Sequence, residues 1–126
     1  MDTAHNYDVR VKWTGGSKGK MRSQAVETTI EVATPPQFPK GVQGIWSPEH
    51  LFVAAVNSCL MTTFLAIAEN SKLEFAHFDS NASGKLEMVD GKYMITAVTL
   101  VPVVTILNEK DKERAEKIIS HHHLAV

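Results

Sequence analysis

An uncharged, strongly apolar stretch in the middle of the chain constrains the fold more than any other feature. Residues 51–68 contain no Asp, Glu, Lys or Arg, and eighteen such residues reach the lower end of the length that spans a bilayer. Polar side chains at Asn57, Ser58 and Thr62 occupy its centre, where they are costly in lipid. No cluster of Lys or Arg flanks it to orient a span. We therefore expect no membrane association, and a helix buried on nearly all sides in a soluble protein.

The start of this helix is marked by three consecutive residues. Ser47 is a good N-cap, Pro48 suits the first helical position, and Glu49 places an acid near the positive end of the helix dipole. From this start we expect the helix to run to about Asn70.

Before the helix, sequence patterns predict strands and a loop. Apolar and charged side chains alternate over residues 7–13, which predicts a strand with one buried face. A turn over 15–19, rich in glycine, precedes a return strand at 21–25. Residues 28–32 read as a third β segment, and Pro and Gly make 34–46 a loop.

After the helix, the chain returns to strands and ends in a second helix. Residues 75–78 open a β region, and an Asp-Gly turn predicts a hairpin between 84–89 and 92–101. Asn108 is a good cap for an amphipathic helix over 109–119. Because the strands are grouped instead of alternating with helices, the sequence predicts an α+β fold with antiparallel sheets.

Length, charge and cysteine content narrow the class of protein. A chain of 126 residues is one domain long, so we expect a single domain over 1–126. Thirteen Lys and Arg nearly balance fourteen Asp and Glu, which predicts no nucleic-acid partner. Cys59 is the only cysteine, and no basic-then-apolar leader opens the chain. These features predict a cytoplasmic protein without disulfides.

An apolar helix of this kind needs partners on every side, and two short sheets from one chain cover it poorly. Its small residues would let a second copy of the helix approach closely; these are Ala54, Ala55, Ser58, Ala66 and Ala68. We predict an obligate two-fold homodimer with a large apolar interface. A monomer whose sheet wraps the helix is the alternative.

The segment from Trp46 to Cys59 resembles the helix signature of the OsmC/Ohr family, the osmotically inducible and organic-hydroperoxide-resistance proteins. A Pro-Glu pair, a face of small residues and a cysteine make up that signature, and a β-meander and an Asp-Gly hairpin flank it here too. The resemblance implies an intertwined α+β homodimer with the long helices at its centre. It also implies thiol-dependent reduction of organic hydroperoxides to alcohols.

The residues themselves are consistent with this chemistry. A thiolate reduces a peroxide by attacking one oxygen, which gives sulfenic acid and an alcohol, and the attack requires a lowered thiol pKa and a nearby cation or donor. Cys59 lies too far along its helix for the dipole to help. Ten helical residues, about 15 Å, separate it from Glu49, so Glu49 could reach only the cysteine of an antiparallel partner helix.

The resemblance implies that an arginine in the turn after the first strand activates the thiol. The carboxylate would hold that arginine in place. Here the turn has no arginine, and Lys18 or Arg22 would supply the charge. A second cysteine, which resolves the sulfenic acid in the family, would fall at or beyond Val126, and the family's final strand is also missing. Either the chain is cut short, or this branch uses one cysteine and an external thiol.

We therefore expect a thiol peroxidase-like enzyme with Cys59 as nucleophile, Glu49 as positioning carboxylate and Lys18 or Arg22 as cation. It would need an external thiol or dithiol reductant and no metal or organic cofactor. The main alternative is a non-catalytic dimer that binds an apolar small molecule in the same inter-subunit cleft, lined by aromatic residues such as Trp46. The histidines at 121–123 do not converge on one ion along a helix, so we expect no metal site there.

Overall fold

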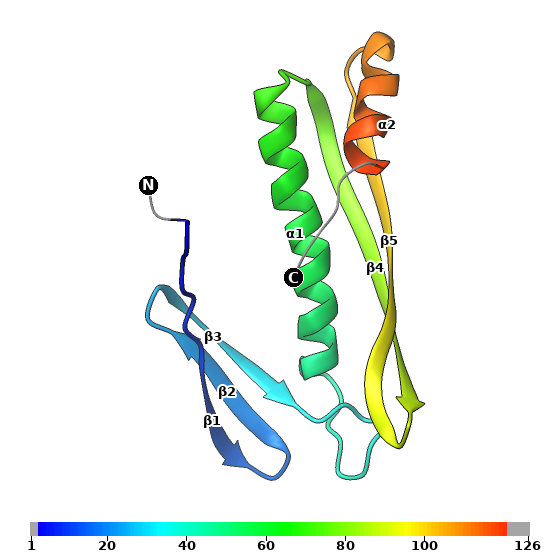
Figure 1. Ribbon diagram of the computed structural model, residues 1–126. Helices are drawn as coiled ribbons and strands as arrows, with labels where there is room; N and C mark the ends of the chain where they lie inside the picture. Colours follow the sequence, from blue (N-terminus) through cyan, green and yellow to red (C-terminus); the bar gives the residue numbers. More distant parts are fainter. Residues whose placement is uncertain (1–2, 121–126) are drawn as a thin grey trace. The chain divides into compact units, whose positions relative to one another are not determined.

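The chain divides into two compact units, Met1–Leu51 and Phe52–Val126. The computed structural model, shown in Figure 1, describes residues 3–120. Antiparallel sheets and helices occur together, so the predicted α+β class is confirmed. The prediction of a single domain over 1–126 stays a prediction.

The first unit is built on a three-stranded antiparallel meander. Its strands β1 (Arg10–Gly15), β2 (Lys18–Ser23) and β3 (Val26–Ala33) pair in the order β1-β2-β3. The β1–β2 turn uses Gly15 and Gly16 at φ of 129° and 56°, a backbone conformation that residues with a Cβ rarely adopt. The predicted glycine turn is therefore confirmed.

The meander has an apolar face that lacks cover within the described chain. Val11 of β1 pairs with Met21 of β2, which pairs with Ile30 of β3, so these side chains share one face. Val11 and Trp13 are nevertheless 64% and 74% exposed. The expectation that this face is buried is wrong for the single chain, although the alternation itself is present.

A turn-rich segment leads from β3 to the long helix α1 (Pro48–Asn70). It returns to the sheet at Trp46, which forms a parallel bridge with Val32 and accepts a hydrogen bond of 2.9 Å from the amide of Ala33. This bridge fixes where the chain leaves the sheet, immediately before α1. The predicted bounds of the helix, Ser47 as cap and Asn70 as end, are confirmed.

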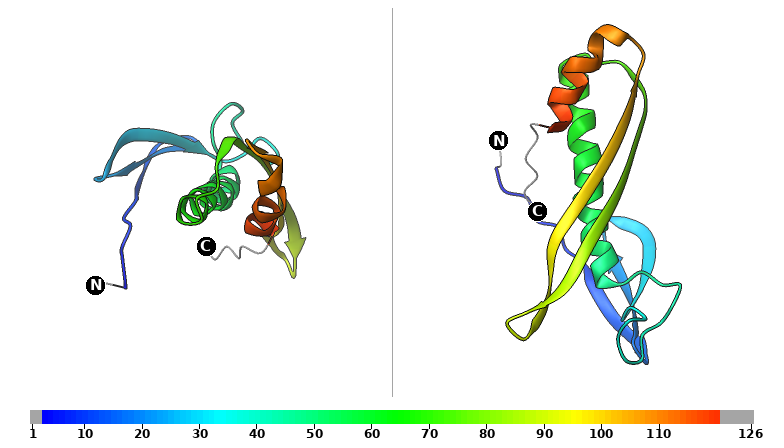
Figure 2. Two further views of the ribbon diagram at one scale, coloured as in Figure 1. Left: turned by 90° about the horizontal axis from the view of Figure 1, so that it is seen from above. Right: turned by 90° about the vertical axis from the view of Figure 1, so that its right-hand side faces the viewer.

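In the second unit, α1 lies beside a long hairpin in all views of Figures 1 and 2. The hairpin consists of β4 (Phe75–Val89) and β5 (Lys92–Ile106), paired antiparallel throughout apart from two register shifts. Asp90 and Gly91 form its turn with φ of 50° and 80°, the positive values that a tight hairpin favours. The two β segments predicted at 75–78 and 84–89 are therefore one strand.

The core of the second unit is a cluster around Phe64. This side chain, 2% exposed, contacts Phe75 edge-on and stacks on Phe78, with ring centroids 5.0 and 5.1 Å apart. Ala68 and Leu73 are buried in the same cluster. Burying one phenylalanine of this kind stabilises a fold by roughly 1.5–3 kcal/mol, so this end of α1 is anchored to the hairpin.

The last helical segment closes the other side of this cluster. It begins as a short 3-10 turn, η1 (Glu109–Asp111), and continues as α2 (Lys112–Ser120). Asn108 stands at the N-cap, as predicted, but its side chain makes no cap hydrogen bond. Arg114 instead ties α2 to the end of α1, where its Nη1 donates to the carbonyl of Ser71 at 2.8 Å.

Candidate functional site

The first turn of α1 is fixed by a reciprocal cap between Ser47 and His50. The Oγ of Ser47 accepts a hydrogen bond from the His50 amide at 3.1 Å and lies 2.7 Å from His50 Nδ1. The Ser47 amide points at the same Nδ1 at 3.4 Å. This is a capping box in which histidine replaces the usual Glu or Gln. The box therefore fixes the backbone that carries Glu49.

Glu49 carries the one anomalous polar atom at this end of the helix. Its Oε1 is buried and has no hydrogen-bond partner among the described residues. A buried carboxylate oxygen without a donor costs free energy, and proteins rarely leave one unpaired. No ion pair joins Glu49 to Lys18 or Arg22, which lie in the same unit. The carboxylate is thus an acceptor that calls for a cation or donor.

Cys59 lies on the same uninterrupted helix, further along. The α1 helix contains every residue between Glu49 and Cys59, so the spacing of about 15 Å along the axis holds. The sulfur is half-buried, and its polar neighbour among the described residues is the Thr63 hydroxyl at 4.0 Å. A thiol that depends on activation would therefore need its charged groups from outside this helix.

Both candidate cations lie on β2 of the meander. Lys18 and Arg22 are exposed and alternate onto the face opposite Val11 and Met21. Neither forms an ion pair with a described residue. The structure thus places Lys18, Arg22 and Glu49 in the first unit without linking them, and Cys59 in the second.

A polar pair near the cysteine was not predicted. Asn57, two residues before Cys59, exchanges two hydrogen bonds with Ser80 of β4. An amide inside an uncharged helix is a signal that could have identified it, because a half-buried amide needs partners.

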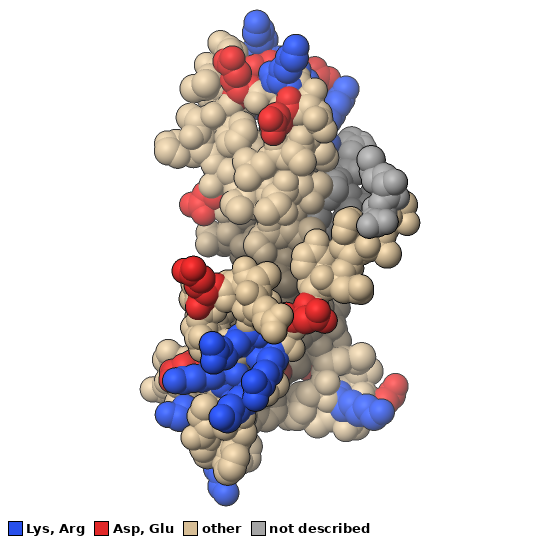
Figure 3. All heavy atoms as spheres, turned by 90° about the vertical axis from the view of Figure 1, so that its left-hand side faces the viewer, with Lys and Arg blue, Asp and Glu red and all other residues tan. Residues whose placement is uncertain are grey.

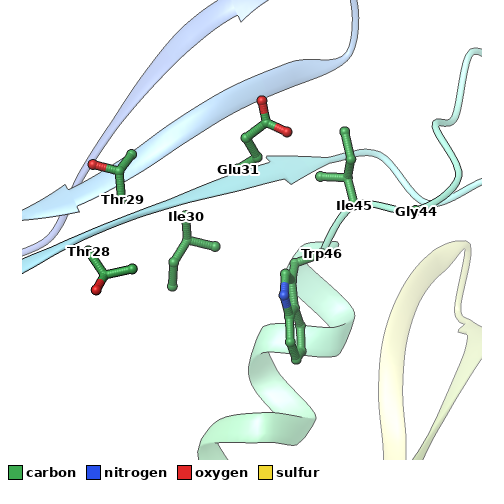
Figure 4. A pocket seen from close by; sticks show the side chains of 7 residues that line it. All are labelled: Thr28, Thr29, Ile30, Glu31, Gly44, Ile45 and Trp46. Atoms are coloured by element: carbon green, nitrogen blue, oxygen red, sulfur yellow. The ribbon is translucent and has the colours of Figure 1, made fainter.

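A shallow pocket of about 330 Å³ occurs in the first unit, where β3 meets the segment before α1. Figure 4 shows Ile30 and Trp46 directed to the same side of this strand. Trp46 also packs edge-on against His50, with ring centroids 6.2 Å apart. Trp46 thus lines a pocket within one chain, and the inter-subunit cleft stays a prediction. The lining residues of this pocket are Thr28, Thr29, Ile30, Glu31, Gly44, Ile45 and Trp46.

Residues 3–120 contain no group of three His, Cys, Asp or Glu side chains that could hold a metal ion. The histidines at 121–123, for which we expect no metal, lie outside the described residues, as does the region of the missing second cysteine.

The sequence profile of the OsmC-like proteins matches residues 40–124, about two-thirds of the chain. The chain belongs to the OsmC-like family. The matched range begins before the cap of α1 and includes Glu49 and Cys59. No curated protein matches this OsmC-like chain by sequence.

Solved structures share the fold of this OsmC-like protein at low identity. An OsmC-like protein of unknown function from Vibrio cholerae superposes with a TM-score of 0.78 at 22% identity, over 94% of this chain and 89% of that one. An organic hydroperoxide resistance protein from Elizabethkingia anophelis gives 0.72 at 20%, over 94% and 84%. One from Bacillus subtilis gives 0.67 at 21%, over 91% and 81%.

Proposed function

We propose that this OsmC-like protein reduces organic hydroperoxides to alcohols through Cys59. The observation that carries the proposal is the buried, unpartnered Oε1 of Glu49, because such an acceptor requires the cation that the reaction also requires. Cys59 stands at the cysteine position of the family's helix signature. Structural neighbours called organic hydroperoxide resistance proteins support the same reading.

The chemical step balances with one thiolate, one hydroperoxide and one proton. The Cys59 sulfur attacks the terminal peroxide oxygen, the S–O bond forms and the O–O bond breaks. Sulfur is oxidised to sulfenic acid, and the alkoxide leaves as an alcohol after taking the proton. Because Cys59 is the only cysteine, an external thiol or dithiol must reduce the sulfenic acid, with release of water and formation of a disulfide on the reductant.

The proposal includes a homodimer that completes the site. The apolar window of α1 has a mean hydropathy of 2.0, enough for a membrane span by length and composition, yet only 17% of it is buried in the single chain. Met61 and Leu65, one turn apart, form an exposed stripe along it, 38% and 39% exposed, whereas Phe52, 46% exposed, lies on the opposite side of the helix from Met61. A second copy of the chain would cover this stripe. An antiparallel pairing of the two helices on the side that carries Glu49 and Cys59 would bring Glu49 of one copy toward Cys59 of the other. A cytoplasmic location fits a reductant-dependent thiol.

Consumption of cumene hydroperoxide with dithiothreitol as reductant tests the proposal. We expect activity in the native protein, complete loss in Cys59→Ser, and a loss of about tenfold or more in Glu49→Gln. Glu69→Gln, at an exposed position near the other end of α1, is the matched control and should retain full activity. Equal consumption by native protein and Cys59→Ser would end the catalytic claim.

A non-catalytic role is the second candidate, and the pocket beside Trp46 favours it. Its lining includes Ile30 and Ile45, side chains that suit an apolar small molecule. Binding of an apolar fluorophore that is lost in Trp46→Ala, together with no hydroperoxide turnover, would favour this role.

A further inference from the structure

One face of the β1–β3 meander carries a concentrated positive charge. Cross-strand pairing places Arg10 opposite Arg22 and Lys12 opposite Lys20, and the alternation of β2 adds Lys18 to the same face. Figure 3 shows Lys and Arg side chains gathered in one patch. We call this patch the basic face; its residues are Arg10, Lys12, Lys18, Lys20 and Arg22.

The basic face does not help the sheet to fold. Like charges directly opposite each other on neighbouring strands destabilise a sheet, and the face has two such pairs. Glu27 and Glu31 on β3 are the nearby acids in the sheet, and Glu31 lies directly opposite Lys20. None of the five cations forms an ion pair with a described residue. The Lys20–Glu31 position offsets part of this repulsion. The positive charge that remains would attract an anionic partner.

The basic face stays free when the other face of the sheet is covered. Val11, Trp13 and Met21 alternate onto the opposite side of β1 and β2. A second copy that covers these apolar side chains leaves Arg10, Lys12 and Lys20 in solvent, while Lys18 or Arg22 remains available to the thiol site. The dimer and the basic face therefore use different sides of the same three strands.

The charge distribution favours a compact partner over an extended polyanion. All five cations fall within residues 9–23, which contain no acid, while the rest of the chain has eight Lys and Arg against fourteen Asp and Glu. Charges interact over about 8 Å at physiological salt, so a small acidic patch centred on β1 and β2 meets mainly the cations, with Glu31 beside Lys20 at its edge. A DNA duplex or a membrane would extend over Glu27 and Glu31 of β3 in the same sheet as well.

The side chains between the cations also disfavour nucleic acid and lipid. Trp13 is the one aromatic residue in the three strands, and it alternates onto the apolar face. The basic face therefore has no ring on which a base could stack and no apolar anchor that could enter a bilayer. The basic face thus presents mainly ammonium and guanidinium groups, which can form ion pairs with the carboxylates of a protein.

We infer that the basic face docks an acidic protein carrying the dithiol that regenerates Cys59. This identity of the partner rests on the proposed peroxidase function, which requires two external thiols for each sulfenic acid. The two thiols become a disulfide, the sulfenic oxygen leaves as water, and Cys59 returns to the thiol. Encounters between redox proteins are small and steered by charge, which five cations on one sheet face can provide.

Binding of a defined peptide tests the docking surface independently of catalysis. The probe is a synthetic peptide with five Glu residues and a Cys-x-x-Cys pair, compared with the same peptide carrying Gln in place of Glu. We expect the acidic peptide to bind more tightly, with an affinity that falls as salt rises and drops about tenfold in the Lys12→Gln, Lys20→Gln double variant. The double variant Lys92→Gln, Lys110→Gln changes the net charge equally and should bind as the native protein does.

Turnover with the same peptides tests the identity of the partner. The kcat/KM for the acidic dithiol peptide should fall about tenfold in Lys12→Gln, Lys20→Gln, while turnover with uncharged dithiothreitol stays unchanged. Lys18 and Arg22 are left intact because they are the candidate cations of the thiol site. Equal use of acidic and neutral peptides, equal losses in the control variant, or tighter binding of a DNA duplex or anionic vesicles would overturn the inference. Peptide binding without any turnover, dithiothreitol included, would refute the peroxidase and with it the partner's redox role.

Discussion

Asn57 and Ser80 hold each other through two hydrogen bonds. The Asn57 Nδ2 donates to the Ser80 carbonyl at 2.8 Å, and the Ser80 hydroxyl donates to Asn57 Oδ1 at 2.6 Å. One partner belongs to α1 and the other to β4, and both are half-buried. The pair therefore fixes how the middle of α1 meets the hairpin, two residues from the cysteine.

Removing one member of this pair should destabilise the protein. Asn57→Ala leaves the Ser80 carbonyl and hydroxyl without partners, and we expect a loss of about 1–3 kcal/mol in the free energy of unfolding. Ser80→Ala removes one bond and should cost less. Urea denaturation of both single variants and the double variant gives the coupling energy. Additive losses would show that the two side chains do not support each other.

Gly84 marks a close approach between β4 and α1. A Cβ at this position would collide with Cγ2 of Val53, and a valine in a helix cannot easily rotate away. We expect Gly84→Ala to destabilise the fold by about 1–3 kcal/mol. Adding Val53→Ala should restore part of this loss by making room. A Gly84→Ala variant as stable as the native protein in urea would contradict the close packing.

The cap formed by Ser47 and His50 should stabilise the start of α1, and a glutamine at position 50 should replace the histidine in it. His50→Ala removes the ring nitrogen that meets the serine hydroxyl, and we expect a loss of about 1 kcal/mol. His50→Gln should retain most of the stability because glutamine can complete a capping box. If the cap also positions Glu49, hydroperoxide turnover should follow the same order. The same turnover in His50→Ala and the native protein would separate the cap from the site.

Two neighbouring side chains lower the pKa of the Glu87 carboxyl, and one of them has the larger effect. The Thr96 hydroxyl, 2.5 Å from its Oε2, and then Lys85, 3.2 Å from its Oε1, lower the pKa of this carboxyl. Its contribution to stability is therefore present above the pKa of the unfolded chain and is lost as pH falls through the folded value. We expect Thr96→Val to raise the pKa of Glu87 more than Lys85→Met does, as measured by NMR titration. The opposite order would make the lysine the main cause.

The exposed stripe of α1 should decide the oligomeric state. We expect sedimentation to show a dimer for the native protein and monomers or aggregates for Leu65→Arg, which places a charge in the stripe. Glu116→Arg on α2 is the control and should remain dimeric. A native protein that sediments as a monomer would remove the basis for a shared site.

Local signals made the long helix and the hairpin turn predictable. The bounds of α1 follow from Ser47, Pro48 and the charge-free stretch, all of which act within a few residues. The full length of β4 did not follow, because residues 79–84 have few strand-forming side chains and extend only through pairing with β5. In the same way, residues 7–9 alternate like a strand but lie outside β1, whose paired residues begin at Arg10.

The site was predictable only as far as it is local. Glu49 and Cys59 follow from the helix signature, and their separation follows from helix geometry. Whether Lys18 or Arg22 meets them does not, because that depends on contacts beyond any one strand or helix. The Asn57–Ser80 pair likewise joins residues 23 positions apart and has no local signal for its second partner.

The exposed apolar side chains of β1 make the newly synthesised chain prone to aggregation. If two chains assemble as proposed, a newly released chain exposes Val11 and Trp13 to water until a second chain arrives, and aggregation of unassembled chains competes with assembly. Assembly from two chains also makes stability rise with protein concentration. Cells that make few copies would therefore hold a smaller fraction of the protein as dimer. At such low levels the dimer concentration would rise with the square of the chain concentration.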